Sequence, residues 1–308
     1  MASQNEIERL YDWLDNFQHH RLGDCADISC AYFDGDFSKR LEQAQTDKHN
    51  WVLDTLGCKE GSRILDVGSG WGPILKAVSE RGGVAVGLNL SPAQTRYCLD
   101  RGLDARLLDW KRADTDTLGM FDGIVCIGAF EHFCSIDEYV AGKQMDIYRA
   151  FFRFCANLLP AGAVLFLQTM TWGDAVPDPA KCTRDAPEGS AERILFRLRS
   201  FYPGSWLPSG KSQILEAASP YFKLIGSSNG RKDYIETGKR WGQATKRIRK
   251  RDKILKTLAT LLPLVPRYVV SSEFRTQIES IRSGDQRRCF EQSIMDHERL
   301  FLGRTDDS

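Results

Sequence analysis

Three glycines at alternate positions follow a short apolar strand pattern at 63–67. The segment reads Ile64-Leu65-Asp66-Val67-Gly68-Ser69-Gly70-Trp71-Gly72, and a helical pattern continues over 73–81. Glycine tolerates the backbone angles of a tight reversal and lets a ligand approach the main chain closely. The unpaired N–H groups at the start of the helix can then face a carboxylate or a phosphate. The segment therefore predicts a strand–turn–helix unit that binds a nucleotide-like ligand.

Downstream of this turn, apolar strand patterns alternate with amphipathic helical patterns. Strand patterns occupy 84–88, 105–108, 123–127 and 163–169. The Ser91-Pro92 pair begins a helix, because serine is a common N-cap and proline suits the first turn. This order predicts a parallel, doubly wound α/β sheet. The remaining predicted elements are helices at 4–22, 39–56, 138–159, 190–200, 212–218 and 239–302, and strands at 222–226 and 234–237.

These patterns divide the chain into three regions. We expect an N-terminal helical lid at 1–60, a core at 61–238 and a C-terminal helical extension at 239–308. Within the core, residues 171–210 lose the alternation and are rich in proline, glycine and aspartate. We interpret this stretch as an insertion that covers the substrate.

The overall composition narrows the class of protein. The formal net charge of +1 gives no field that would attract nucleic acid. Nine cysteines are scattered without a CxxC pair or zinc spacing, which is typical of reduced cytoplasmic thiols and predicts no metal site. No apolar run reaches about 18 residues, and the polar start of the chain is unlike a secretory signal. We therefore expect a cytoplasmic protein without a membrane span.

Two classes of cofactor bind at glycine-rich turns of this kind. A dinucleotide site has the spacing G-x-G-x-x-G and an acidic residue at the end of the second strand. Here the spacing is G-x-G-x-G, and the second strand ends in Leu88-Asn89-Leu90. The L-D-V-G-x-G-x-G form instead resembles the first motif of class I S-adenosylmethionine-dependent methyltransferases.

Further motifs resemble one branch of that superfamily, the cyclopropane fatty acid synthases and mycolic acid cyclopropane synthases. The resemblance covers about residues 25–245 and implies a seven-stranded, Rossmann-like class I methyltransferase fold. The motifs that carry it, besides the glycine segment, are Ser29-Cys30-Ala31-Tyr32-Phe33, Leu41-Glu42-Gln43-Ala44-Gln45 with Lys48, Gly87-Leu88-Asn89-Leu90-Ser91 with Gln94, Asp109-Trp110, Ile127-Gly128-Ala129-Phe130-Glu131-His132, Phe201-Tyr202-Pro203-Gly204, Leu207-Pro208-Ser209, and Tyr234 with Trp241.

The resemblance also implies which residues hold S-adenosylmethionine. Ser29, Gly68 and Gly72 would hold its methionine part, Asn89 and Gln94 would lie near the ribose, and Asp109 and Trp110 would flank the adenine. Asn89 could instead close a turn, and Trp110 could be a core aromatic. The remaining predicted contacts are Asp66, Gly70, Trp71, Leu90 and Ile127.

The chemistry that the resemblance implies is attack of an alkene on the sulfonium methyl group, followed by loss of a proton. A bound bicarbonate would be the base, held by the backbone of Cys30 and Met170 and by the side chains of Glu131 and Tyr234. A carboxylate can also accept the proton itself once burial raises its pKa. The predicted catalytic set is Glu131, Tyr234, Cys30, Gln168 and His132. The alternative is that Glu131 and His132 only cap the loop after the fourth strand.

Two positions depart from the family pattern close to the reaction centre. Gln168-Thr169-Met170 stands where the family usually has His-Thr-Ile, and Ile28 stands where it has tyrosine. Glutamine keeps a hydrogen-bond donor but cannot carry a proton. Simple C-methylation, which ends in deprotonation to an alkene, therefore competes with cyclopropane closure.

Aromatic and basic residues suggest the substrate. Tyr32, Phe33, Phe201, Tyr202 and Trp206 could face a carbocation, although each could equally fill the core. Arginine binds diphosphates bidentately, and Arg197 is a candidate for that role. The nine Lys/Arg residues within 239–256 have three possible interpretations. They could be a solvated helix face, a contact with an anionic membrane surface, or a site for a phosphorylated substrate. We expect an unsaturated fatty acyl chain, with a prenyl diphosphate as the alternative and small-molecule N-methylation third.

Overall fold

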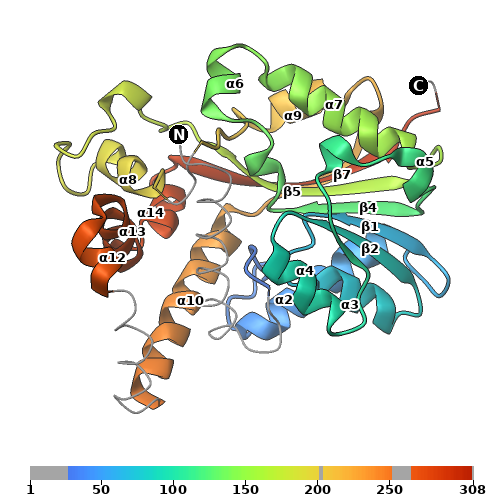
Figure 1. Ribbon diagram of the computed structural model, residues 1–308, viewed down its shortest axis with the longest axis horizontal. Helices are drawn as coiled ribbons and strands as arrows, with labels where there is room; N and C mark the ends of the chain where they lie inside the picture. The colour runs from blue at the N-terminus through green and yellow to red at the C-terminus, as the bar shows by residue number, and fades with distance from the viewer. Residues whose placement is uncertain (1–26, 201–203, 252–264, 307–308) are drawn as a thin grey trace.

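The computed structural model describes residues 27–200, 204–251 and 265–306, with the side chains of 244–251 and 267 excepted. One mixed sheet has the strand order β3-β2-β1-β4-β5-β7-β6 (Figure 1). Strands β1 to β5 run parallel, whereas β7 is antiparallel to both of its neighbours. The strands are β1 (Arg63–Val67), β2 (Val84–Asn89), β3 (Ala105–Leu107), β4 (Gly123–Ile127), β5 (Val164–Trp172), β6 (Phe222–Asn229) and β7 (Met295–Arg304).

Helices cover both faces of the sheet. Alternate residues of a strand point to opposite faces, so Ile64 packs with one layer of helices and Leu65 with the other. One layer holds α2 (Leu41–Thr55), α3 (Pro73–Glu80) and α4 (Pro92–Leu99), and the other holds α5 (Thr115–Leu118), α7 (Gln144–Asn157) and α9 (Lys211–Ala218). Burial on both faces explains the nearly continuous apolar runs of β1 and β4.

The remaining helices are short connections or lie beyond one end of the sheet. The connections are η2 (Trp110–Arg112), η3 (Phe130–His132), α6 (Ile136–Val140) and η4 (Pro179–Lys181). A group at the left of Figure 1 contains α8 (Ala191–Leu198), α12 (Val265–Val270), α13 (Ser272–Ser283) and α14 (Asp285–Glu291), and α10 (Arg231–Arg251) runs beside it away from the sheet.

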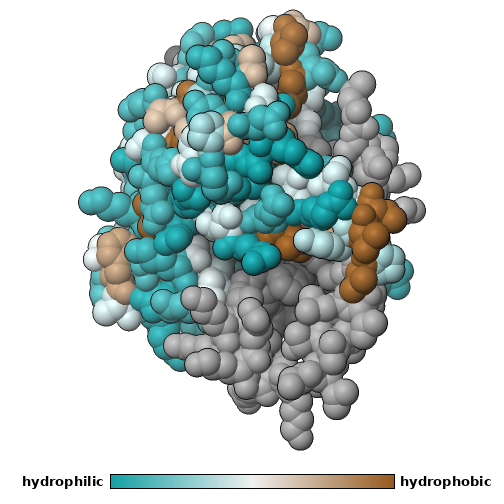
Figure 2. All heavy atoms as spheres, turned by 90° about the vertical axis from the view of Figure 1, so that its left-hand side faces the viewer, coloured by the Kyte–Doolittle hydropathy of each residue, from teal (hydrophilic) through white to brown (hydrophobic). Residues whose placement is uncertain are grey.

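The described part of the surface at this end of the molecule is largely hydrophilic. Figure 2 views it face-on and shows apolar side chains in small, separate groups among polar ones. Helix α12 contributes exposed apolar residues, since Val265, Val269 and Val270 are 53%, 67% and 81% exposed. Single apolar side chains of this kind are normal on a protein surface.

The predicted first five strands are confirmed, and so are the helices predicted at 73–81, 190–200 and 212–218, which are α3, α8 and α9. Ser91 caps α4 as expected, because its Oγ accepts a hydrogen bond of 3.3 Å from the backbone N–H of Gln94. The predicted helix at 138–159 is instead two helices. Gly142, with φ of 72°, breaks the pattern, and α7 starts at Gln144.

The prediction for the end of the sheet is wrong. Residues 234–237 belong to helix α10 rather than to a strand, and 239–302 is not helical throughout. Its last part begins β7, which lies between β5 and β6 and so joins the core. The strand was missed because two of its buried residues are the polar His297 and Arg299. The helix expected at 4–22 lies outside the described residues.

Within the described part of the chain, no helix is long and apolar enough to cross a membrane. The eight cysteines in that part are buried and free of disulfides. The same residues contain no group of three His, Cys, Asp or Glu that could hold a metal ion.

Candidate active site

The glycine turn after β1 is shaped by backbone angles that favour glycine. Gly68, Gly70 and Gly72 have φ of 87°, 53° and 77°. A Cβ on Gly68 would overlap Ala129, and one on Gly72 would lie 2.9 Å from the Cys98 Sγ. At Gly70, in contrast, no atom of another described residue, apart from its two chain neighbours, lies within 4 Å of the point that a Cβ would occupy. The turn is therefore packed on two sides and open on the third, as a ligand cradle needs to be.

The end of β2 is tied to this turn. The Asn89 side chain donates a 2.9 Å hydrogen bond to the Gly70 carbonyl and accepts one from the Ser91 N–H. Asn89 thus closes the turn, which is one of the two roles that the sequence suggested for it. Leu90 follows it and is 56% exposed at the lip of the strand. Gln94 is buried in the first turn of α4.

Asp66 lies beneath the turn and is buried in β1. Burial first, and the neighbouring Asp27 carboxylate second, raise the pKa of Asp66 to about 7. Trp71 on the turn packs edge-on against Tyr97 at 4.8 Å. Ile127, the last residue of β4, pairs with Gln168 of β5.

Asp109 and Trp110 follow β3 as predicted. The Asp109 carboxylate caps η2 by accepting a 3.0 Å hydrogen bond from the Lys111 N–H. The Trp110 ring lies within 5.8 Å of Phe133, Phe151 and Phe154, so most of it belongs to the core. Its exposed edge borders an open cavity of about 580 Å³ along α7.

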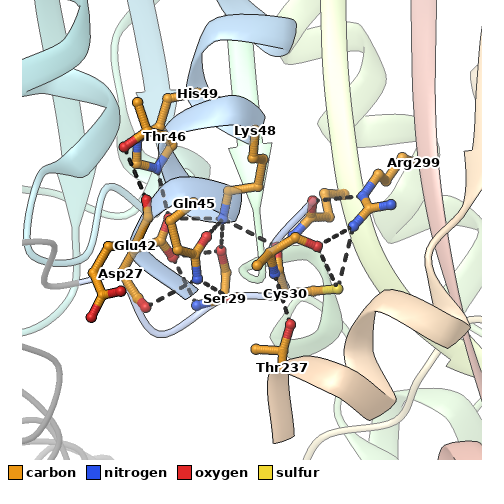
Figure 3. A network of polar contacts seen from close by, with 12 residues as sticks. Asp27, Ser29, Cys30, Glu42, Gln45, Thr46, Lys48, His49, Thr237 and Arg299 are labelled. Atoms are coloured by element: carbon orange, nitrogen blue, oxygen red, sulfur yellow. Dashed lines mark hydrogen bonds and ion pairs between the residues drawn. The ribbon is translucent and has the colours of Figure 1, made fainter. Parts of the chain in front are cut away.

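A polar network fixes the segment that carries Ser29 and Cys30 (Figure 3). Lys48 of α2 is fully buried and donates to the Asp27 carboxylate at 2.7 Å and to the Ser29 Oγ at 2.6 Å. His49 contacts the same carboxylate at 2.7 Å. Although burial opposes ionisation, Lys48 and His49 hold the pKa of Asp27 well below its usual range. The Ser29 hydroxyl therefore accepts from Lys48 and itself donates to the Asp27 carboxylate at 2.7 Å.

Cys30 is held through its backbone and is chemically quiet. Its carbonyl accepts from Lys48 at 3.2 Å and from Gln168 at 3.3 Å. Burial raises the pKa of the Cys30 thiol to about 12, so a thiolate nucleophile is excluded near neutral pH.

Glu131 is the carboxylate at the carboxyl ends of β4 and β5. It is 2% exposed, and its Oε1 accepts a 2.8 Å hydrogen bond from the Met170 N–H. Its Oε2 is buried and has no hydrogen-bond partner among the described residues. Burial raises the pKa of Glu131 to about 7. An unsatisfied buried carboxylate oxygen is costly, so it indicates a functional site more than a loop cap.

The other predicted catalytic residues differ in how close they lie to this centre. Tyr234 shares an apolar cluster with Cys30 and Met170, stacks on Phe290 at 4.3 Å, and accepts a hydrogen bond from Gln286. His132 is exposed, and its Nδ1 lies 2.9 Å from the Ser205 Oγ. The His132 side chain thus points towards Ser205, in the predicted insertion at 171–210, whereas the Glu131 side chain points into the protein towards Met170.

The predicted aromatic substrate contacts are mostly packed against other residues. Tyr32 stacks on Trp51 at 4.4 Å, and Phe33 is fully buried with Ala31 and Ala44. Trp206 stacks on Tyr139 at 4.5 Å. Phe201 and Tyr202 lie outside the described residues. Of the described aromatic candidates, Phe33 is therefore the one whose position is best explained by a role in the core.

The diphosphate clamp expected of Arg197 is wrong. Arg197 is 2% exposed, and its guanidinium donates to both oxygens of Asp285, at 2.7 and 3.1 Å. The remaining Nη1 donates to Glu188 at 2.7 Å. Two carboxylates already use the donors that a phosphate would need, so Arg197 joins α8 to α14 instead.

In the basic stretch, Lys239 and Arg240 both pair with Glu236, at 3.5 and 2.7 Å. Arg240 also donates to the Phe37 carbonyl at 2.6 Å. These two cations therefore behave as part of a solvated helix face, and the side chains from 244 onward in this stretch are not described.

The sequence patterns missed three buried polar residues next to the site. Arg299 and His297 lie on β7, opposite Gln168 and Met170 of β5, and Asp233 lies at the start of α10. Arg299 is 1% exposed and ion-paired with Asp233 at 2.7 Å. Arg299 falls in a helix predicted from the sequence, where nothing indicated that it would lie beside the site. Only the pairing of β7 with β5 shows this.

The arrangement agrees with comparisons to known proteins. A family model described as mycolic acid cyclopropane synthetase matches residues 1–273. Cyclopropane mycolic acid synthase 2 of Mycobacterium leprae is 31% identical over 218 residues, which make up 66% of this chain and 67% of that protein. Hydroxymycolate synthase MmaA4 of Mycobacterium tuberculosis is 30% identical over 246 residues, or 77% and 76% of the two chains. The crystal structure of mycolic acid cyclopropane synthase CmaA1, complexed with SAH and CTAB, matches with a TM-score of 0.74 at 26% identity, covering 97% of this chain and 98% of that one.

The strand order and the glycine turn after β1 define a class I S-adenosylmethionine-dependent methyltransferase. Within that class, the chain belongs to the mycolic acid cyclopropane synthetase family. The fold class and the family expected from the sequence motifs are thereby confirmed.

Proposed function

We propose that this enzyme transfers the methyl group of S-adenosylmethionine to a carbon of the double bond in an unsaturated fatty acyl chain. One observation supports the chemistry most directly. Glu131 is a buried carboxylate with one oxygen fixed by the Met170 N–H and the other without a partner among the described residues. Burial raises its pKa to about 7, where a carboxylate serves well as a general base.

The residues around the turn fit the cofactor. Among the described residues, the space above Gly70 is open. Gly128 across the switch point, with φ of 69°, likewise has no described atom beyond its chain neighbours within 4 Å of the point that a Cβ would occupy. The N–H groups of Gly68, Ser69 and Gly72 donate within the fold and Pro73 has none, so the N–H groups that would face a carboxylate are those of Gly70 and of the first turn of α3 after Pro73. When bound there, S-adenosylmethionine would supply an electrophilic methyl group. We propose Gly68, Gly70, Gly72, Leu90 and Gln94 as its contacts.

The proton step falls to Glu131. The alkene π electrons would form a bond to the methyl carbon while the carbon–sulfur bond breaks with its electron pair left on sulfur, and the substrate would be left with a cationic carbon. Glu131 then takes one proton through Oε2 and becomes a neutral carboxylic acid, which its buried surroundings favour. Loss of that proton from the added methyl group closes a ring, and loss from a neighbouring carbon gives a methyl-branched alkene.

Bicarbonate is the alternative base. One ligand that the family pattern implies is replaced here, because Gln168 stands in place of a histidine, and two of the implied donors already have partners in the fold. The Met170 N–H bonds Glu131, and Gln168 donates to the Cys30 carbonyl. We propose direct proton transfer to Glu131. The comparison of rates in carbonate-free and bicarbonate-supplemented buffer separates the two bases. Unchanged rates support Glu131, whereas a bicarbonate requirement contradicts direct transfer.

A labelled-methyl assay tests the substrate class. The enzyme is incubated with radiolabelled S-adenosylmethionine and matched panels of unsaturated and saturated fatty acyl lipids, with prenyl diphosphates and amines as further panels. We expect label only in the unsaturated acyl products. Label in prenyl diphosphates or amines would overturn the acyl assignment, and absence of cofactor binding by calorimetry would overturn the cofactor assignment. We also propose a cytoplasmic location, which the eight buried free thiols support.

A further inference from the structure

Arg299 uses all three of its guanidinium nitrogens beside the reaction centre. Its Nε donates to the Gln168 Oε1 at 3.2 Å, and its Nη1 to the Asp233 Oδ2 at 2.7 Å. Its Nη2 donates to the Ala31 carbonyl at 2.7 Å and lies 3.4 Å from the Cys30 Sγ. Figure 3 shows the guanidinium reaching from β7 towards the segment around Cys30. One side chain thus connects β5, β7, α10 and that segment.

The contact determines which way the Gln168 amide faces. A guanidinium can only donate hydrogen bonds, so the group that faces the Arg299 Nε is the amide oxygen. The amide nitrogen is then left on the other side, where it donates to the Cys30 carbonyl at 3.3 Å. Each amide nitrogen carries two N–H groups, so a second donor remains on the side of Cys30.

The charge of Arg299 is balanced at the same place. Asp233 is 7% exposed and pairs with it at 2.7 Å, so the two residues together add no net charge. A neutral pair suits a site that would hold a sulfonium cofactor and a cationic substrate, because an unpaired buried cation would repel both. The ion pair can therefore orient its neighbours without opposing the reaction.

We propose that Arg299 is a positioning residue: it locks the Gln168 amide so that this residue presents N–H groups to the reaction centre. Gln168 stands where the family usually has a histidine, and the Arg299 contact supplies the fixed donor direction that a glutamine alone lacks. The α10 helix supports the same segment, because the Ala31 N–H donates to the Thr237 Oγ1 at 3.1 Å. This inference rests on the proposed methyl transfer, but its geometric part can be tested without turnover.

The kinetic test is a double-mutant cycle with Arg299→Lys and Gln168→Ala. Lysine keeps a cation for Asp233 but cannot also hold Gln168 and Ala31. We expect Arg299→Lys to lower kcat about tenfold in the wild-type background and by less than about twofold when Gln168 is already alanine. Gln168→Glu should be as slow as Gln168→Ala, because it keeps the bond to Arg299 but loses the donor.

Arg304→Lys is the matched control. Arg304 lies on the same strand, at the end away from the site, and donates to the carbonyls of Ala156 and Thr305. We expect this variant to keep the wild-type kcat. Two results would overturn the proposal and leave the methyltransferase assignment intact. One is that the fold reductions in kcat of Arg299→Lys and Gln168→Ala multiply in the double variant. The other is full activity of Gln168→Glu.

A second readout needs no substrate. In the full-length enzyme saturated with S-adenosylhomocysteine, the side-chain amide resonances of Gln168 are identified by their loss in Gln168→Ala. We expect two distinct, slowly exchanging N–H signals that broaden and exchange faster in Arg299→Lys, with no change in Arg304→Lys. Unchanged signals in Arg299→Lys would overturn the inference even if the proposed methyl transfer itself failed.

Discussion

Glu131 combines two properties that are seldom combined in a structural carboxylate. It is almost completely buried, yet one of its oxygens lacks a hydrogen-bond partner within the described structure. Burial of a carboxylate favours its protonated form, which raises its pKa and makes the ionised form a stronger base. Burial of the carboxylate therefore costs stability, and a role as a base in the reaction would account for that cost.

The first prediction concerns the rate. Glu131→Gln keeps the size and the contact with the Met170 N–H but cannot accept a proton, so we expect kcat to fall by roughly 10²–10⁴-fold. In the wild type, kcat should rise with pH through an apparent pKa near 7, because Glu131 has to be ionised to act as the base. Steady-state kinetics as a function of pH measure both effects. A flat wild-type profile, or a variant within about threefold of wild type, contradicts the role of Glu131.

The second prediction concerns stability. The folded-state pKa of Glu131, about 7, lies above its ordinary value of 4.5, so ionisation weakens the folded state as pH rises through this interval. Glu131→Gln avoids that loss and should be more stable than wild type by about 3 kcal/mol near pH 8, but not near pH 4. Urea unfolding at the two pH values measures the difference. If wild type and Glu131→Gln were equally stable at both pH values, ionisation of the buried Glu131 would not cost the folded state any stability.

At the scale of elements, the segment around Ser29 depends on one buried ion pair. The third prediction is that Lys48→Met destabilises the fold by about 3–5 kcal/mol, because it leaves the buried Asp27 carboxylate without its main partner. Arg81→Met is the control, since the Asp54 side chain of that pair is 70% exposed and the change should cost less than about 1 kcal/mol. Chemical denaturation compares the two. Similar small losses in both variants would show that Lys48 does not hold the segment.

The strands differ in how well the sequence predicts them. The runs of β1, β4 and β5 are apolar because helices cover both sheet faces there, so local patterning was sufficient to find them. Strand β7 places Arg299 and His297 inward, and the Arg299 partners Gln168 and Asp233 lie 131 and 66 residues away in the chain. Local periodicity cannot report partners at that distance. For the same reason, Arg299 was not among the site residues predicted from the sequence.

At the scale of the whole molecule, the site forms where the chain changes direction across the sheet. The glycine turn follows β1 and Glu131 follows β4, and these adjacent strands form the switch point of the strand order. The motifs were sufficient to predict the fold, the cofactor class and this placement. They left two roles open for Asn89, near the ribose or closing the turn, and they did not predict that Arg197 would be bound by Asp285, because these contacts are made only on folding.

The most direct test uses S-adenosylmethionine with a trideuterated methyl group and an unsaturated fatty acyl lipid, followed by mass spectrometry and NMR of the product. We predict that the deuterated carbon is bonded to a carbon of the former double bond, with deuterium lost only if a ring has closed. Glu131→Gln should give little of this product under the same conditions. Deuterated methyl groups on oxygen or nitrogen, with the double bond intact, would contradict the account.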